Sequence, residues 1–319
     1  MGYKGENVMS ELSERIKVMR EMAFASTDGV QKVLRDIYDM LDANEDSLKQ
    51  CYEVDKEGTN KKENLIIKRM LDAVQDTIDY QFADTEVHEM IDERRVLEFK
   101  QNMGVIGVIY NGDVYATVEL ITKALKTNNA IILNVGINDY IGTNNLIVKS
   151  IKEILEKNNK PAGLVEINFS ENEELANEDL DQIIVIGDRA KQTRVNSLNL
   201  NTLKSGYGHG EIYVDDLENE KFVKELLSKV DYNIQLYIKE ELATDLPGTR
   251  VANFEEAINR INKEGAGYAA AIFSNDAETQ RAFMKRVKCK FSFINASPSI
   301  ARELDIYITD MYYKKVGMV

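Results

Sequence analysis

The stretch MGVIGVIYNGDVYATVELITKALKTNNAIILNVG, from Met103 to Gly136, decides the fold. Residues 105–109 form a nearly continuous apolar run, which is typical of a parallel strand buried on both faces. The apolar residues of 118–125 then recur at the spacing of a helix, and the β-branched run AIILN follows them. The stretch therefore predicts one strand–helix–strand (βαβ) unit.

The ends of these two strands are the first place to look for a ligand site. Ligands in open α/β sheets bind beyond the carboxyl ends of the strands. Tyr110, Asn111 and Tyr115 follow the first strand, and Asn134 stands at the end of the second. We therefore take these four residues as candidate cleft residues.

The rest of the chain extends this pattern in both directions. Residues 9–87 carry apolar stripes at helical spacing and predict an α-helical lead-in. A helix over 144–158 and the strands LVEINF and QIIVIG predict a doubly wound, Rossmann-like parallel sheet. Short apolar strands and a helix return between 233 and 297 and predict a second, reduced α/β domain.

The expected fold class is therefore α/β, in three parts. The helical lead-in and the first α/β domain take residues 1–216, and the reduced second domain takes 217–300. The tail 301–319 contains DIYITDMYY, whose loose alternation and aromatic residues predict an exposed edge strand that seeks a partner.

A glycine-rich loop, GYGHG, lies between the two domains. Its spacing is not G-x-G-x-x-G, and it precedes a strand where a dinucleotide-binding loop would follow one. A flexible loop is therefore favoured over a phosphate cradle. Gly206, Gly208 and His209 remain candidate cleft residues, with His209 either a turn residue or a cleft residue.

Composition excludes several classes of partner and site. The net charge of −14 argues against nucleic acid and anionic membranes, because both repel an acidic surface. Two cysteines and two histidines supply neither a disulfide framework nor a metal cluster, so no metal is expected. The sequence shows no membrane-length apolar run and no apolar signal core, and a reducing cytoplasm is the expected compartment.

Several segments together resemble the aldehyde dehydrogenase superfamily, most closely its glutamate-5-semialdehyde dehydrogenases, also called γ-glutamyl phosphate reductases. These segments, in family order, are GVIGVIY, ALKTNNAIIL, GEIYVDD, EEAINRINKEGAGYAAAIFSND and INAS. The resemblance implies a first domain that binds NAD or NADP and a second domain that carries a catalytic cysteine. It also implies a strand that joins subunits into dimers or larger homo-oligomers.

The departures from the family fall on its chemistry. The family's thiolate forms a covalent intermediate that exchanges hydride with the nicotinamide. Here the segment that would carry this cysteine is missing between KELLSKVDYN and IQLYIKEEL. Tyr115 replaces the asparagine that would hold the oxyanion, and loss of such a donor typically costs about 100- to 1000-fold in rate. Asn134 stands where the family has arginine or lysine, and Cys51 and Cys289 match no catalytic position.

Three functions follow as alternatives. The favoured one is a degenerate, non-catalytic protein that keeps the scaffold and binds a small metabolite, a nucleotide or a partner enzyme, with or without NAD or NADP. The second is an active oxidoreductase of the semialdehyde or acyl phosphate type, which would use Cys289 as its nucleophile. A buried structural role for Cys289 is favoured over this, because free cysteine is among the most buried residue types. The third is a structural subunit that pairs through the tail.

Overall fold

The structure is a computed structural model. It describes residues 4–25, 29–57, 65–82, 85–91, 94–136, 140–170, 173–199, 201–229, 233–301 and 304–318. The chain begins with four helices, as the sequence predicts: α1 (Lys4–Ala25), α2 (Val30–Ala43), α3 (Glu45–Lys56) and α4 (Ile67–Asp79). Among the described residues no helix is long and apolar enough to cross a membrane.

A five-stranded parallel sheet forms the centre of the first α/β unit. The strand order is β5-β4-β3-β6-β7, so the chain starts in the middle and winds outward first to one side and then to the other. All residues of β3, β4 and β6 are buried, because helices cover both faces of the sheet. The strands are β3 (Val105–Tyr110), β4 (Ala130–Val135), β5 (Val165–Phe169), β6 (Gln182–Ile186) and β7 (Thr202–Ser205).

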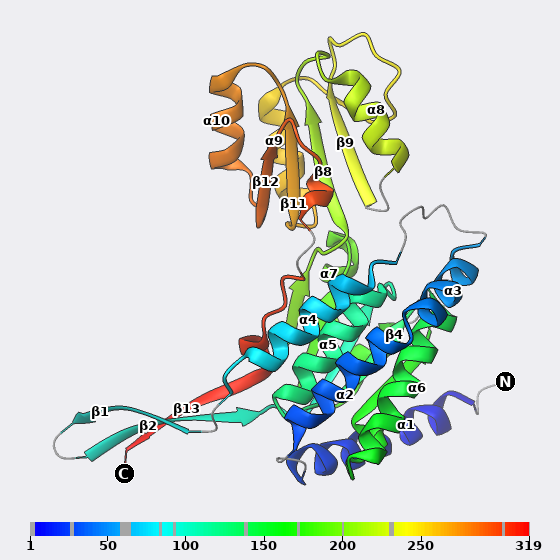
Figure 1. The fold of residues 1–319 in the computed structure, drawn as a ribbon. Helices are drawn as coiled ribbons and strands as arrows, with labels where there is room; N and C mark the ends of the chain where they lie inside the picture. Colours follow the sequence, from blue (N-terminus) through cyan, green and yellow to red (C-terminus); the bar gives the residue numbers. More distant parts are fainter. Residues whose placement is uncertain are drawn as a thin grey trace.

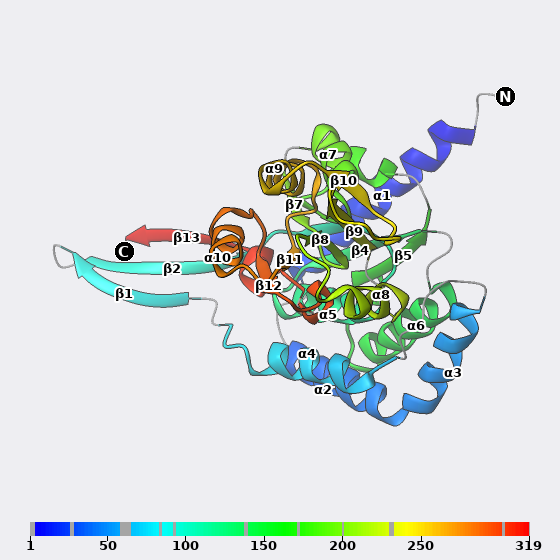
Figure 2. The ribbon, with the colours of Figure 1, turned by 90° about the horizontal axis from the view of Figure 1, so that it is seen from above.

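The helices stack in layers on this sheet (Figure 2). The connecting helices α5 (Val114–Lys126) and α6 (Ile141–Lys157) lie on one face, and α1 and α7 (Arg189–Leu198) lie on the other. The remaining lead-in helices α2, α3 and α4 form an outer layer over α5 and α6. Because α5 lies between the sheet and α4, most of its side chains are buried. The predicted doubly wound α/β fold is confirmed.

A second five-stranded parallel sheet has the same pattern, with the order β10-β9-β8-β11-β12 (Figure 1). One core, which includes Val223 and Leu226, packs α8 on one face of the sheet, and another, which includes Ile258 and Phe283, packs α9 and α10 on the opposite face. The elements are β8 (His209–Val214), α8 (Glu220–Lys229), β9 (Asn233–Lys239), β10 (Thr249–Val251), α9 (Phe254–Glu264), β11 (Ala269–Phe273), α10 (Ala277–Arg286) and β12 (Phe291–Ile294).

The two sheets divide the chain earlier than residue 216, the boundary expected from the sequence. Strand β8 is the central strand of the second sheet, not a strand of the first. The reason is the length of its connection, since β7 ends at Ser205 and β8 begins at His209. Parallel neighbours need a crossover of about a dozen residues or more, so β8 cannot lie beside β7 in a parallel sheet. The edge strand β12 is only partly buried, in contrast to the buried strand expected there.

A three-stranded antiparallel sheet projects from the first unit as an arm (Figure 1). Its order is β1-β2-β13, and β13 forms an edge of it. The helical lead-in predicted to continue to Val87 is wrong at its end, because β1 forms a ladder with β2 from Thr85 onward. The tail is a strand only from Tyr312 onward, as β13, so the edge strand predicted over DIYITDMYY is wrong for most of that segment. Ile306, Ile308 and Met311 are buried, and Ile308–Met311 form a 3₁₀ turn. The strands are β1 (Thr85–Ile91), β2 (Arg94–Asn102) and β13 (Tyr312–Met318).

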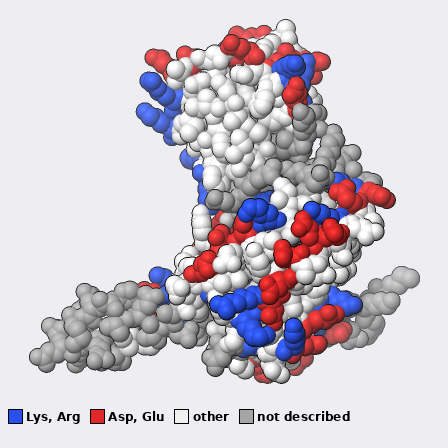
Figure 3. All heavy atoms as spheres, in the orientation of Figure 1, with Lys and Arg blue, Asp and Glu red and all other residues white. Residues whose placement is uncertain are grey.

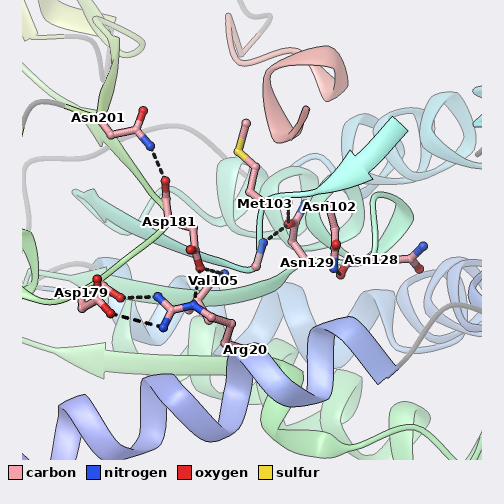
Figure 4. Close-up of polar contacts among 10 residues, drawn as sticks. Arg20, Asn102, Met103, Val105, Asn128, Asn129, Asp179, Asp181 and Asn201 are labelled. Atoms are coloured by element: carbon pink, nitrogen blue, oxygen red, sulfur yellow. Dashed lines mark hydrogen bonds and ion pairs between the residues drawn. The ribbon is translucent and has the colours of Figure 1, made fainter. Parts of the chain in front are cut away.

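The buried Asn129 and the partly buried Asp181 tie the arm, α1 and the C-terminal segment to the start of β3, and Figure 4 shows their contacts with Met103, Val105 and Arg20. Asn129 accepts hydrogen bonds from the Met103 and Gly104 amides at 2.7 and 2.9 Å and donates to the Met311 carbonyl at 2.6 Å. Asp181 accepts from the Val105 amide at 2.8 Å and from Arg20 of α1 at 2.9 Å. These contacts fix the amino end of β3 against α1 and the C-terminal segment.

Candidate functional site

An arginine that stacks on one tyrosine and donates a hydrogen bond to another lies where the two α/β units meet the lead-in. Arg69 comes from α4, Tyr115 from the first turn of α5, and Tyr207 from the loop between β7 and β8. The Arg69 guanidinium carbon is 3.7 Å from the Tyr115 ring centroid, and its Nη2 donates to the Tyr207 hydroxyl at 2.7 Å. The two ring centroids are 6.5 Å apart. The position expected for an oxyanion donor is therefore filled by a stacked ring.

The structure brings only some of the expected cleft residues together. Tyr115 lies beside the loop that contains Gly206, Gly208 and His209, through its contact with Tyr207. Gly206 is required there, because a Cβ would lie 2.8 Å from Ala266 and Tyr268. His209 Nε2 lies 3.3 Å from the Asn233 amide nitrogen, and burial lowers the pKa of this histidine.

The other expected cleft residues lie elsewhere. Tyr110 is fully buried, and its hydroxyl is 2.5 Å from Thr117 Oγ1, within the packing of α5 against the sheet. Asn134 is buried at the end of β4, where its Nδ2 donates to the Ser170 carbonyl at 3.3 Å. Asn111 is half-buried in the turn after β3.

A cavity of about 410 Å³ opens beside Tyr115, between α4, α5 and the C-terminal segment. We call it the α4–α5 cavity. Sequence analysis missed it, although Tyr115, Glu119 and Lys123 are spaced four residues apart and so share one face of α5. Nothing in the sequence predicts that Tyr307 lines this cavity, because its position depends on how distant segments pack. Its walls include Tyr80, Tyr115, Glu119, Lys123, Leu304 and Tyr307.

Charge in the α4–α5 cavity is concentrated on α5. Glu119 Oε1 lies 2.5 Å from Lys123 Nζ, and Lys123 also donates to the Ile306 carbonyl at 2.6 Å. Burial, together with the Glu119 carboxylate, raises the pKa of the Tyr115 hydroxyl above its ordinary value. Tyr115 is therefore a neutral phenol near pH 7, and cannot act as a base there.

The Cys289 thiol is not activated. Cys289 donates its Sγ–H to the Phe291 carbonyl at 2.8 Å, and burial, with a smaller effect of Glu211, raises its pKa to about 12. Cys51 lies on α3. Lys229 ends α8 and Asn233 begins β9, so the segment that would carry a nucleophile between them is short. Among the described residues no three His, Cys, Asp or Glu side chains come together as ligands for a metal.

The helix N-termini at the carboxyl edge of the first sheet are occupied by carboxylates of the chain itself. Asp113 accepts from the Ala116 amide at the start of α5, and Asp188 accepts from the Lys191 amide at the start of α7. Asp55 of α3 accepts from two amides in the first turn of α6, at 3.0 and 2.7 Å. Such N-termini bind phosphates in dinucleotide-binding folds. An aspartate at each of them opposes a dinucleotide's phosphates, so these residues do not fit the cofactor.

The sequence is similar to that of γ-glutamyl phosphate reductases, although no family model matches it. The reductase of Clostridium botulinum is 26% identical over an alignment of 255 positions, gaps included, that covers 61% of this chain and 61% of that protein. The reductase of Alkaliphilus oremlandii is 25% identical over 369 residues and covers 91% of this chain and 88% of its own length. The chain thus matches about three fifths of the first relative. The 369 aligned positions exceed the 319 residues of this chain, so parts of the second relative face gaps.

Solved structures share the fold over nearly the whole chain. The γ-glutamyl phosphate reductase of Thermotoga maritima matches with a TM-score of 0.63 at 18% identity, covering 96% of this chain and 97% of that one. An acetylating aldehyde dehydrogenase from Geobacillus thermoglucosidasius matches with a TM-score of 0.67 at 12% identity, covering 98% and 96%.

A third solved structure contains a nicotinamide cofactor. The glyceraldehyde-3-phosphate dehydrogenase of Methanocaldococcus jannaschii, complexed with NADP, matches with a TM-score of 0.68 at 13% identity, covering 98% and 94%. The resemblance that the sequence indicates is thereby confirmed: this chain is similar in sequence to γ-glutamyl phosphate reductases and has the fold of the aldehyde dehydrogenase superfamily.

Proposed function

We propose that this chain is a non-catalytic protein with the reductase fold, which binds a small molecule in the α4–α5 cavity. The observation that carries the proposal is the state of Cys289. A thiol acts as a nucleophile only as the thiolate, and catalytic cysteines have pKa values lowered by nearby positive charge. Cys289 has its pKa raised to about 12 and its proton donated to a carbonyl. It is a structural cysteine.

The surroundings of Tyr115 support the same proposal. An oxyanion hole needs donors aimed at a space where the reacting oxygen will develop charge. Arg69 covers the Tyr115 ring at 3.7 Å and is itself bonded to Tyr207. The guanidinium therefore fills space beside the ring and fastens the lead-in to the loop between the two units.

We also expect that this chain does not bind a nicotinamide cofactor. Asp113, Asp55 and Asp188 satisfy the amides that phosphates would use, and each adds negative charge at the same place. The net charge of −14 acts in the same direction over the whole surface. A nicotinamide dinucleotide therefore meets unfavourable electrostatics at this edge, and we expect no binding of NAD or NADP.

Assembly with a second copy of the chain is favoured by the arm. Strand β13 is an edge strand of its sheet, and Tyr313 and Val316 on it are 43% and 69% exposed. Exposed apolar edge strands are templates for pairing with another chain. We expect a homodimer or larger homo-oligomer formed through this edge, with sedimentation velocity as its direct measurement.

The decisive experiment separates thiol chemistry from binding. In Cys51→Ser, Cys289 is the single thiol, so its alkylation by iodoacetamide can be followed between about pH 7 and pH 9.5. A pKa near 12 predicts a rate that rises about tenfold per pH unit without a plateau. In parallel, wild-type protein should oxidise no NADPH with acyl phosphates and reduce no NADP with semialdehydes. An alkylation plateau below about pH 8, or turnover that disappears in Cys289→Ser, would refute the proposal.

A further inference from the structure

We propose that the α4–α5 cavity takes a small organic cation, a primary amine with a short apolar body. Glu119 and Asp76 would hold its ammonium group, and the tyrosine rings would hold the body. This inference rests on the proposed function in that it names the ligand class for the same cavity. The cavity volume of about 410 Å³ lies in the range that small-molecule sites occupy.

The first step concerns the hydrogen bonds of Glu119. Its side chain is only 7% exposed, Lys123 pairs with its Oε1, and the Tyr115 hydroxyl interacts with the same carboxylate. Its Oε2 atom has no partner within hydrogen-bond distance among the described residues. A buried carboxylate oxygen without a hydrogen-bond donor is unfavourable. A ligand that brings an N–H group to this oxygen would remove that cost. An ammonium group carries three donors and no acceptor, which suits this carboxylate.

The second step concerns the charge of the lining. Lys123 already donates to Glu119 Oε1 and to the Ile306 carbonyl. Asp76 adds an exposed carboxylate at the wall formed by α4. The lining therefore has two carboxylates against one ammonium. A cation balances this charge, whereas an anion would be repelled.

The third step concerns the walls. Tyr80, Tyr115 and Tyr307 come from three different segments and line the same space. Cations bind over aromatic faces, and aromatic walls with a carboxylate are a usual site for ammonium groups. Leu304 and Ile308 add apolar surface for an aliphatic chain. A body of a few carbons thus has contacts that a bare metal ion or ammonia would not use.

Three probes with one carbon skeleton test the inference: butylammonium, 1-butanol and butyrate, at matched ionic strength. Calorimetry and thermal shift should show binding of butylammonium, about tenfold weaker binding of butanol, and no binding of butyrate. Asp76→Asn and Glu119→Gln should each weaken the amine by about tenfold. Glu153→Gln, which removes an exposed carboxylate on α6, is the matched control and should leave binding unchanged.

The outcomes separate this inference from the proposed function. Because Asp76 is exposed, Asp76→Asn is expected to fold, and it keeps the test open if Glu119→Gln does not. Binding of butyrate at least as tight as that of butylammonium would overturn the inference, as would binding of none of the three. Amine binding unchanged in Asp76→Asn and in any folded Glu119→Gln would also overturn it. None of these results bears on turnover, which the NADPH assays measure separately.

Discussion

The two α/β units share one strand order but differ in how completely they are built. In each, the central strand comes first, two strands follow on one side and two on the other. In the first sheet the three inner strands β3, β4 and β6 are wholly buried, and the edge strands β5 and β7 are partly buried. In the second sheet only β11 is wholly buried, β10 has three residues and β12 is partly buried. On the face shown in Figure 3, charges of both signs interleave over the helical layer, whereas the second unit presents a broad uncharged centre.

This difference shows which parts of a doubly wound unit are dispensable for the fold. The second unit lacks a helix between β9 and β10 within the described segment 240–248, yet its five strands keep parallel neighbours. The shortening around α8 and β9 falls where the family resemblance places the nucleophile. Strand pairing and the two small cores are enough to hold the sheet, so the fold does not need a longer segment between α8 and β9.

The carboxyl edges of both sheets are alike in another respect. In the second unit, Asp215 accepts from the Ser274 hydroxyl at 2.8 Å, and Asp216 accepts from the Asn275 amide at 2.6 Å. These carboxylates bind the turns at the edge, as Asp113 and Asp188 do in the first unit. At both edges, aspartates of the chain accept hydrogen bonds from nearby amide or hydroxyl groups. The α4–α5 cavity lies to one side of the first sheet, between α4 and α5.

The largest expected effect tests whether the two units are separate cooperative bodies. Phe273→Ala removes a fully buried ring from the core that α8 forms with the second sheet, and should cost about 3–5 kcal/mol. Leu133→Ala in β4 of the first unit should cost about 2–5 kcal/mol. If the units unfold independently, each variant shifts one transition in a urea titration followed by fluorescence and circular dichroism.

The outcome that contradicts this is a single transition that both variants shift equally. The two units would then unfold as one body, and the incomplete second unit would draw its stability from the first. Val18→Ala, which truncates an exposed side chain on α1, is the control and should shift neither transition measurably.

The central strand of the second sheet carries a buried carboxyl group that the central strand of the first lacks, and this group predicts a pH dependence of the second unit's stability. β3 is apolar apart from a glycine and the buried Tyr110, whereas β8 carries Glu211, which is 3% exposed. Burial raises the pKa of Glu211 from 4.5 to about 7. Its Oε1 accepts from the Ala266 amide at 2.8 Å, and Arg189 contributes a smaller opposing effect on the pKa. Between about pH 4.5 and pH 7, the folded state therefore keeps a proton on Glu211 that the unfolded state releases.

The sign of the effect follows from that shift. Stability from protonated Glu211 is fully present below about pH 4.5 and is lost as pH rises through about 7, by about 3 kcal/mol in total. Glu211→Gln should remove this dependence and make the second unit more stable than wild type near pH 8. Urea midpoints measured from about pH 5 to pH 8 test it. If the urea midpoints of wild type and Glu211→Gln change with pH by the same amount, the Glu211 carboxyl group is not protonated in the folded protein.

How far the sequence predicts the structure depends on how local each feature is. The strands β3 and β4 and the helix between them follow from apolar periodicity alone, because both faces of each strand are buried. The place of β8 depends on the length of the link before it, which periodicity does not report. Strand β1 was expected as helix because TEVHEMI has no strong period, and only its ladder with β2 fixes it.

The candidate site divides in the same way. Tyr115 was predicted because it follows β3 directly, and its neighbours Glu119 and Lys123 are recoverable from their helical spacing. Arg69 was not predictable, because nothing within α4 says which tyrosine it will meet. Asn134 is predicted as a cleft residue because it ends the second strand, and its contact with the Ser170 carbonyl arises only when β5 pairs with β4.

The smallest expected effect compares one helix cap in each unit. Asp188 caps α7 in the first unit through the Lys191 amide at 2.7 Å, and Asn253 caps α9 in the second through the Glu256 amide at 3.0 Å. Each alanine variant should cost about 1 kcal/mol, because an N-cap side chain satisfies one of the helix's unpaired amides. The charge makes a second distinction. Asp188→Asn keeps the hydrogen-bond acceptor and should lose only the few tenths that the negative charge adds at low salt. If Asp188→Asn loses as much free energy of unfolding as Asp188→Ala, the aspartate stabilises α7 through its charge and not through its hydrogen bond.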